Sequence, residues 1–237
     1  MTGMLASVCS IAEAKLVQES DIDIIDLKDP REGALGALEL SVVKNIVDLI
    51  DGVTPVSATI GDIPFQAELL EPVIHNMMLT GVDIIKIGVF GNITGLSELA
   101  MINKLTQRGA RIVLVIFAEE YDEEYDFEKL AETGLVGVML DTMDKQSGSL
   151  RDKLSDSALT KFVDSANSYG LLSGLAGSLT VKDIPSLLAM APDYLGFRGG
   201  LCQQGRRENT LDRETINTVR QKIPDSKSKI ITSSLTV

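Results

Sequence analysis

Short apolar runs rich in Val and Ile alternate along the chain with longer amphipathic stretches of helical length. The runs have the length of buried strands, and the stretches between them repeat apolar residues with a helical period. The pattern predicts strands at Met4–Ser10, Ile22–Leu27, Pro55–Ile60, Val82–Gly88, Arg111–Phe117, Leu135–Leu140, Leu171–Gly174 and Tyr194–Phe197. It predicts the helices that follow them at Ile11–Glu19, Leu38–Ile50, Gln66–Leu79, Gly95–Arg108, Phe127–Glu132, Ser155–Ser168, Val181–Met190 and Thr210–Lys222.

Eight strand–helix units in this length of chain predict a single (β/α)8 TIM barrel. Nearly continuous apolar strands are typical of parallel strands that are buried on both faces. A doubly wound open sheet is the alternative, but the first strand leads into Ser10–Ala14 rather than into a glycine-rich dinucleotide turn. We therefore expect an α/β fold with one barrel domain over 1–226 and a C-terminal tail over 227–237.

Charge and composition narrow the classes of partner. The 237 residues carry a formal net charge of −12, and aromatic residues make up only 4% of the chain. Both values disfavour nucleic acid as a partner, although a local cluster of basic side chains and backbone N–H groups can still bind a small anion. Cys9 and Cys202 lie far apart and form no metal or disulfide motif, so we expect no metal and no cofactor.

The chain shows no sign of a membrane location. Its first residues have no basic region ahead of an apolar stretch, and no uncharged apolar run is long enough for a membrane span. We therefore expect a cytoplasmic protein. Self-association stays open, because apolar segments such as 77–79 fit either the core or an interface between copies.

Two predicted strands each contain a lysine in an apolar run. Lys28 lies in the segment 23–30, which reads DIIDLKDP, and Lys86 lies in the segment 82–88, which reads VDIIKIG. A buried ammonium is costly unless it is paired or does chemistry. The plainer interpretation is that each lysine pairs with a nearby carboxylate. The other is that both lysines serve an active site at the ends of their strands.

In a barrel of this kind, the functional side chains lie at the carboxyl ends of the strands. Those positions hold Asp26 with Lys28, then Lys86, then Asp141 with Lys145 in the loop that follows. A lysine whose pKa is depressed by like charges and burial is a free amine that can form a Schiff base, and a second lysine can act as a base beside it. The alternative is a ring of salt bridges that closes the barrel core. The one histidine, His75, is predicted to be structural, so Ser–His and Cys–His triads are excluded.

Small residues at the ends of the last two strands predict a phosphate site. Gly177 and Ser178 follow the seventh strand, and Arg198, Gly199 and Gly200 follow the eighth. These are the loops that bind phosphate in many barrels, through backbone N–H groups near a helix N-terminus. Tight turns with Arg198 in an ion pair are the alternative. Polar residues at the end of the third strand are further candidates for binding substrate, namely Thr59 and Asp62.

At these residues the chain resembles the (5-formylfuran-3-yl)methyl phosphate synthases of methanofuran and methylofuran biosynthesis. The resemblance covers most of the chain and rests on the segments 23–30, 32–37, 56–64, 86–91, 139–142 with Lys145, 175–178 and 197–200 with Cys202. Glu119, in the acidic stretch after the fifth strand, stands where an aspartate is familiar in that family.

The resemblance implies a lyase of one-carbon metabolism that condenses two molecules of glyceraldehyde 3-phosphate with loss of phosphate and water. It implies that Lys28 forms the Schiff base, that Lys86 accepts a proton, and that Asp26, Asp141 and Lys145 surround the site. Two other functions stay open at this point. One is a class I aldolase or isomerase acting on another sugar phosphate. The other is a barrel that only binds a phosphorylated ligand.

Overall fold

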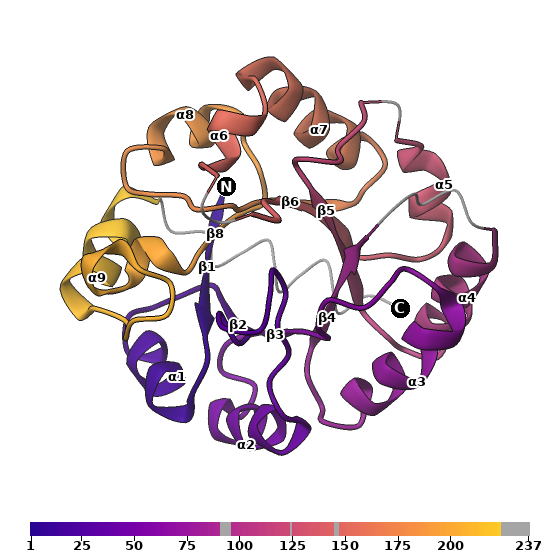
Figure 1. The fold of residues 1–237 in the computed structure, drawn as a ribbon, viewed down its shortest axis with the longest axis horizontal. Helices are drawn as coiled ribbons and strands as arrows, with labels where there is room; N and C mark the ends of the chain where they lie inside the picture. The colour runs from indigo at the N-terminus through magenta and orange to yellow at the C-terminus, as the bar shows by residue number, and fades with distance from the viewer. Residues whose placement is uncertain (91–95, 124, 145–146, 224–237) are drawn as a thin grey trace.

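The fold is a closed parallel barrel. The computed structural model describes residues 1–90, 96–123, 125–144 and 147–223. Within them, eight parallel strands pair in chain order, and β1 pairs with β8 to close the sheet (Figure 1). The strands are β1 (Gly3–Val8), β2 (Ile24–Leu27), β3 (Val56–Thr59), β4 (Ile84–Val89), β5 (Ile112–Phe117), β6 (Gly137–Asp141), β7 (Leu172–Leu175) and β8 (Tyr194–Phe197). The predicted TIM barrel is thus confirmed, and an open sheet is excluded.

A ring of helices covers the outside of the barrel (Figure 1). Its members are α1 (Ile11–Gln18), α2 (Leu40–Ile50), α3 (Ala67–Met78), α4 (Leu96–Thr106), α5 (Phe127–Glu132), α6 (Leu150–Lys153), α7 (Asp156–Ser168), α8 (Ile184–Ala189) and α9 (Arg213–Lys222). Two 3-10 turns, η1 (Gly199–Leu201) and η2 (Gln203–Gly205), follow β8. The periodicity did not predict α6 or these turns, because one turn of helix is too short to show a repeat. The tail expected at 227–237 lies outside the described residues.

The apolar residues form two layers on either side of the sheet. The outer layer joins the outward-facing strand residues to the helices, and the inner layer fills the barrel interior. The inner layer is built from large side chains on successive strands, including Leu5, Ile24, Ile84, Val113, Phe117, Met139 and Tyr194. The barrel interior is therefore a packed core, and a site can form only above it, at the carboxyl ends of the strands.

Three aspartates hold the opposite, amino-terminal rim of the barrel. Asp23, Asp83 and Asp193 each stand just before a strand and accept a hydrogen bond of 2.7–2.9 Å from the backbone N–H of a residue at or near the start of a neighbouring strand. Asp23 also pairs with Arg220 of α9 at 2.7 Å. Because these bonds satisfy backbone donors and join adjacent strands, they help to set the register of the sheet.

No helix within the described residues has the length and apolar character needed to cross a membrane.

Candidate active site

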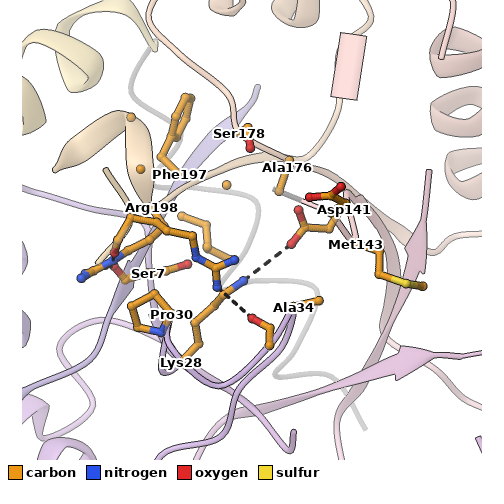
Figure 2. Close-up of a pocket in the computed structure, with 18 of the residues that line it drawn as sticks. Ser7, Lys28, Pro30, Ala34, Asp141, Met143, Ala176, Ser178, Phe197 and Arg198 are labelled. Atoms are coloured by element: carbon orange, nitrogen blue, oxygen red, sulfur yellow. Dashed lines mark hydrogen bonds and ion pairs between the residues drawn. The ribbon is translucent and has the colours of Figure 1, made fainter. Parts of the chain in front are cut away.

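A cavity of about 690 Å³ opens at the carboxyl end of the barrel (Figure 2). Most of the residues predicted for the site line it together: Lys28, Lys86, Asp62, Asp141, Gly177, Ser178, Arg198, Gly199 and Gly200. Asp26 and Thr59 lie behind this wall and do not line the cavity. Lys145 lies outside the described residues. The structure therefore brings most of the residues that the sequence singled out to one cavity.

Lys86 and Asp26 form a buried ion pair beneath the cavity floor. Lys86 Nζ donates to Asp26 Oδ1 at 3.0 Å, and the Asp26 side chain has no exposed surface. Ser7 and Ser57 donate to the two carboxylate oxygens at 2.8 and 2.7 Å. Burial alone would raise the pKa of Asp26, but Lys86, Lys28 and the two hydroxyls together hold that pKa below its ordinary value. Asp26 therefore stays ionised at neutral pH.

Lys28 and Asp141 face each other across the mouth of the barrel. Lys28 follows β2 and Asp141 ends β6, which stands on the opposite side of the closed sheet. Lys28 Nζ lies 3.7 Å from Asp141 Oδ2, and Figure 2 shows the two side chains pointing toward each other over the cavity. The backbone N–H of Thr142 donates to Asp141 Oδ1 at 2.8 Å and fixes that carboxylate.

The two lysines thus occupy different settings. Each lysine pairs with its own carboxylate, as the plainer interpretation of the sequence proposed, so pairing explains how the two ammonium groups can be buried. The two pairs influence each other, since Lys28 also lowers the pKa of Asp26, but they do not close the barrel, because both lysines line an open cavity. A pair that served only the core would be enclosed by packed side chains. The arrangement can therefore present an amine to a small molecule from above.

The loops after β7 and β8 meet on one wall of the cavity. Gly177 and Ser178 have φ values of 112° and 50°, so two successive residues are in the left-handed region. A side chain at Gly200 would collide with the backbone carbonyl of Leu179, which shows how closely the two loops touch. Such turns of small residues form concave backbone surfaces suited to anions. No α-helix begins directly at these loops, because the short 3-10 turn η1 follows β8 and α8 starts only at Ile184.

Arg198 differs from the expectation that its side chain binds phosphate. Its Nη1 and Nη2 pair with Glu13 of α1 at 2.6 and 3.2 Å. Its remaining N–H groups donate to the carbonyls of Ser7, Arg207 and Asn209 at 2.9–3.2 Å. A guanidinium has five N–H donors, and these bonds use all of them. Arg198 therefore forms a buried ion pair with Glu13, which was the alternative to phosphate binding in the sequence analysis. Its role is to hold the loop after β8 in place.

Of the two candidates at the end of the third strand, Thr59 does not line the cavity and Asp62 does. Thr59 donates its hydroxyl hydrogen to the carbonyls of Gly36 and Leu27, at 2.9 and 3.3 Å, and is wholly buried. Asp62 does line the cavity, but its oxygens accept from the backbone N–H groups of Ala34 and Leu35 at 2.8 and 2.7 Å. Both residues therefore shape the loop between β2 and α2 that forms one wall of the cavity.

The comparison with known proteins agrees with this geometry. A sequence model of the 4-HFC-P synthase family matches residues 4–220. The chain belongs to the 4-HFC-P synthase family. A Methylorubrum extorquens protein, to which (5-formylfuran-3-yl)methyl phosphate synthase activity is provisionally assigned, is 40% identical over 88% of this chain and 86% of its own. The (5-formylfuran-3-yl)methyl phosphate synthase of Methanocaldococcus jannaschii is 32% identical over 92% of this chain and 98% of its own.

Solved structures outside the 4-HFC-P synthase family share the fold. A phosphoribosyl anthranilate isomerase from Thermus thermophilus has a TM-score of 0.68 at 12% identity, covering 94% of this chain and 98% of its own. A 3-hexulose-6-phosphate synthase has a TM-score of 0.66 at 18% identity, covering 93% and 100%. At these identities the likeness shows the barrel alone. The family resemblance drawn from the sequence is confirmed, and its finer chemistry has to be argued from the site.

Sequence reasoning missed two residues of this cavity, Arg206 and Arg207, which line it from the loop after β8. They lie six or more residues beyond Gly199 and Gly200, and neither strand periodicity nor loop position shows that they face the cavity. Ser7 and Ser57, which hold Asp26, stand beside it in the two neighbouring strands, on the same inward face as Asp26.

The remaining candidates lie away from the chemistry. His75 is exposed in α3 and does not line the cavity, and Glu119 accepts from the backbone N–H groups of Met143 and Asp144 at 2.9 and 3.3 Å. Cys202 is buried as expected, and burial raises its pKa to about 11, whereas Cys9 is partly exposed. Among the described residues, no three His, Cys, Asp or Glu side chains are grouped to hold a metal ion.

Proposed function

We propose that this protein is a (5-formylfuran-3-yl)methyl phosphate synthase that condenses two molecules of glyceraldehyde 3-phosphate in the route to methanofuran or methylofuran. One observation carries the proposal beyond family membership. Two lysines from different strands and the carboxylate of Asp141 line one cavity, beside the small-residue loops after β7 and β8. That combination suits a small phosphorylated aldehyde, with amines at one end and an anion site at the other.

Lys28 is the proposed nucleophile. As a neutral amine, its Nζ attacks the aldehyde carbon of one triose, and the resulting carbinolamine loses its hydroxyl as water to give an iminium. The carboxylate of Asp141, 3.7 Å from Nζ, lies where it stabilises that positive charge. The iminium draws electrons from the neighbouring carbon and so acidifies its C–H bond.

Lys86 is the proposed proton carrier. Its ammonium, hydrogen-bonded to Asp26, donates the proton that removes the hydroxyl as water. It is then a neutral amine and accepts the proton from the carbon beside the iminium, which leaves an enamine. The enamine carbon forms the bond to the aldehyde of the second triose. Overall, two C3H7O6P give C6H7O6P with one H3PO4 and two H2O.

The local charge suits an anionic substrate in spite of the acidic chain. The cavity is lined by five basic residues, Lys28, Lys86, Arg198, Arg206 and Arg207, and by four acidic ones, Asp62, Asp141, Asp144 and Glu208. The cavity therefore does not share the acidic balance of the chain, whose net charge is −12, and its low-dielectric walls strengthen the attraction between its basic groups and an anion. The proposed partner is thus a small phosphorylated carbonyl compound.

A product assay tests the function. The purified protein is incubated with glyceraldehyde 3-phosphate as the sole substrate, and the products are separated and identified by mass spectrometry. We expect release of inorganic phosphate together with a compound of the composition C6H7O6P. A sugar phosphate that retains both phosphoryl groups would instead identify an aldolase, and recovery of unchanged triose phosphate would refute the proposal. The Lys28→Ala variant is the control that must give neither product.

A further inference from the structure

Arg207 is one of the basic residues that line the cavity, and its backbone carbonyl accepts a hydrogen bond from Arg198. It belongs to the loop after β8, and its Cβ lies 3.8 Å from the position that a Cβ at Gly199 would take. From there its Nη2 reaches the carbonyl of Gly33, in the loop between β2 and α2, at 3.0 Å. The side chain therefore joins the loop after β8 to the loop after β2, past β1, which stands between these two strands.

The hydrogen bonding of Arg207 is far less complete than that of Arg198. Within the described residues, its guanidinium makes one hydrogen bond, to Gly33, and no salt bridge. One of its five N–H donors is used, which leaves four for another acceptor. The side chain is half-buried, and this burial lowers the pKa of Arg207, while the carboxylates of Asp141, Glu208 and Asp62 act in the opposite direction. Placing a cation there is costly unless an anion compensates it.

The loop that carries Arg207 is held in place from below. Arg198 donates to the carbonyls of Arg207 and Asn209, and the Asn209 side chain donates to the carbonyl of Gln203 at 2.9 Å. Cys202 forms an isolated bridge with Leu211 at the base of the loop. The guanidinium of Arg207 therefore projects from a braced loop. A preorganised donor of this kind loses little freedom when a ligand binds.

We propose that Arg207 binds a second phosphoryl group, separate from the one held by the small residues Gly177, Ser178, Gly199 and Gly200. The inference rests on the proposed function, in which two phosphorylated trioses meet in one cavity. Two phosphoryl dianions repel each other, and a planar guanidinium with adjacent free N–H groups is the side chain best suited to bind one of them. Gly33 lies on the wall that carries Lys28, so the second group binds on the β2 side of the cavity.

Binding of inorganic phosphate in the absence of any substrate is the first test. Thermal unfolding is followed at increasing phosphate concentration and constant ionic strength, for the wild type, Arg207→Gln, Arg207→Lys and Arg213→Gln. Arg213 is an exposed arginine of α9 and serves as the charge-matched control. Because each bound ion raises Tm, we expect a clearly smaller rise for Arg207→Gln, an intermediate rise for Arg207→Lys and an unchanged rise for Arg213→Gln. An unchanged rise for Arg207→Gln would overturn the inference.

Steady-state kinetics give the second test. Loss of a charge-assisted contact should raise the KM for glyceraldehyde 3-phosphate about tenfold or more in Arg207→Gln, while borohydride trapping of the first triose on Lys28 persists. A variant that loses trapping together with turnover would assign Arg207 to the first site and refute a separate one. If the wild type forms no furan product, the proposed function fails, and the phosphate-binding test still decides the role of Arg207.

Discussion

Lys86 donates a hydrogen bond of 3.0 Å to Asp26 across strand β3, and almost no surface of either side chain is exposed. Ser57, on the intervening strand, donates to the same carboxylate oxygen at 2.7 Å. Asp26 does not line the cavity, whereas Lys28 and its partner Asp141 both do. The two lysines that the sequence left equivalent thus differ in their partners.

The buried carboxylate of Asp26 should be needed for folding stability. In Asp26→Asn the Lys86 ammonium loses its counterion in a dry setting, so we expect the free energy of unfolding in urea at pH 7 to fall by about 3–5 kcal/mol. Asp48→Asn, which breaks an exposed pair with Lys44, is the control and should cost less than about 1 kcal/mol.

The sign of the pH dependence follows from the depressed pKa of Asp26. A carboxyl whose folded pKa lies below its unfolded value stabilises the protein fully above the unfolded pKa, here about 3.8, and loses that contribution as pH falls through the folded pKa. The difference in stability between wild type and Asp26→Asn should therefore be constant near pH 7 and shrink below about pH 4. A difference that grows on acidification would contradict this assignment.

The lysines could be predicted because their position follows from local sequence. A strand period of two places Asp26 and Lys28 on one face, and the barrel topology brings the ends of all strands to one mouth. The roles of Arg198 and Arg207 could not be predicted in this way. Glu13, which captures Arg198, is 185 residues away in the sequence, and only the closed barrel brings β1 beside β8.

Thr59 illustrates the same limit on a smaller scale. Its place at the end of β3 suggested contact with substrate, but the loop that follows β2 folds over it and takes its hydroxyl hydrogen at Gly36. The path of such a loop depends on tertiary hydrogen bonds that no periodicity encodes. Sequence patterns therefore indicated which end of the barrel carries the cavity. Only the structure shows which of the side chains there face the cavity and which hold the loops in place.

Lys86→Gln should separate the two amine roles. With Lys28 intact and Lys86 unable to donate or accept a proton, we expect borohydride to trap triose on Lys28 more slowly than in the wild type, while furan product falls by at least about a hundredfold, the usual contribution of a positioned acid–base group. Product is measured by mass spectrometry. Full turnover in Lys86→Gln would show that another group carries the proton.

Gly177 should be sensitive to substitution for two reasons. Its φ of 112° disfavours any side chain, and a Cβ there would lie 2.8 Å from Thr142 Cγ2, next to Asp141. Gly109→Ala is a matched control, since Gly109 has a φ of 94° but open space around it. We expect both variants to lose about 1–2 kcal/mol from the backbone strain, and only Gly177→Ala to raise the KM for substrate. If Gly109→Ala raised the KM as much as Gly177→Ala does, backbone strain alone would explain the effect, and contact with Thr142 would not.

Arg198 should control the mobility of the loop after β8. Arg198→Lys cannot reproduce the contacts to Glu13 and to the carbonyls of Arg207 and Asn209, so the loop should open more often. Because trypsin cleaves after arginine, we expect faster cleavage after Arg206 and Arg207 than in the wild type, together with weaker phosphate binding. Arg213→Lys should leave the cleavage rate unchanged. If trypsin cleaved Arg198→Lys no faster than the wild type, Arg198 would not be what holds this loop in place.

The most direct measurement of the central claim is borohydride trapping in the presence of glyceraldehyde 3-phosphate, followed by peptide mass spectrometry. The account predicts one reduced triose adduct per chain, on Lys28, and none in Lys28→Ala. An adduct found on Lys86 or Lys145 instead, with Lys28 unmodified, would contradict it.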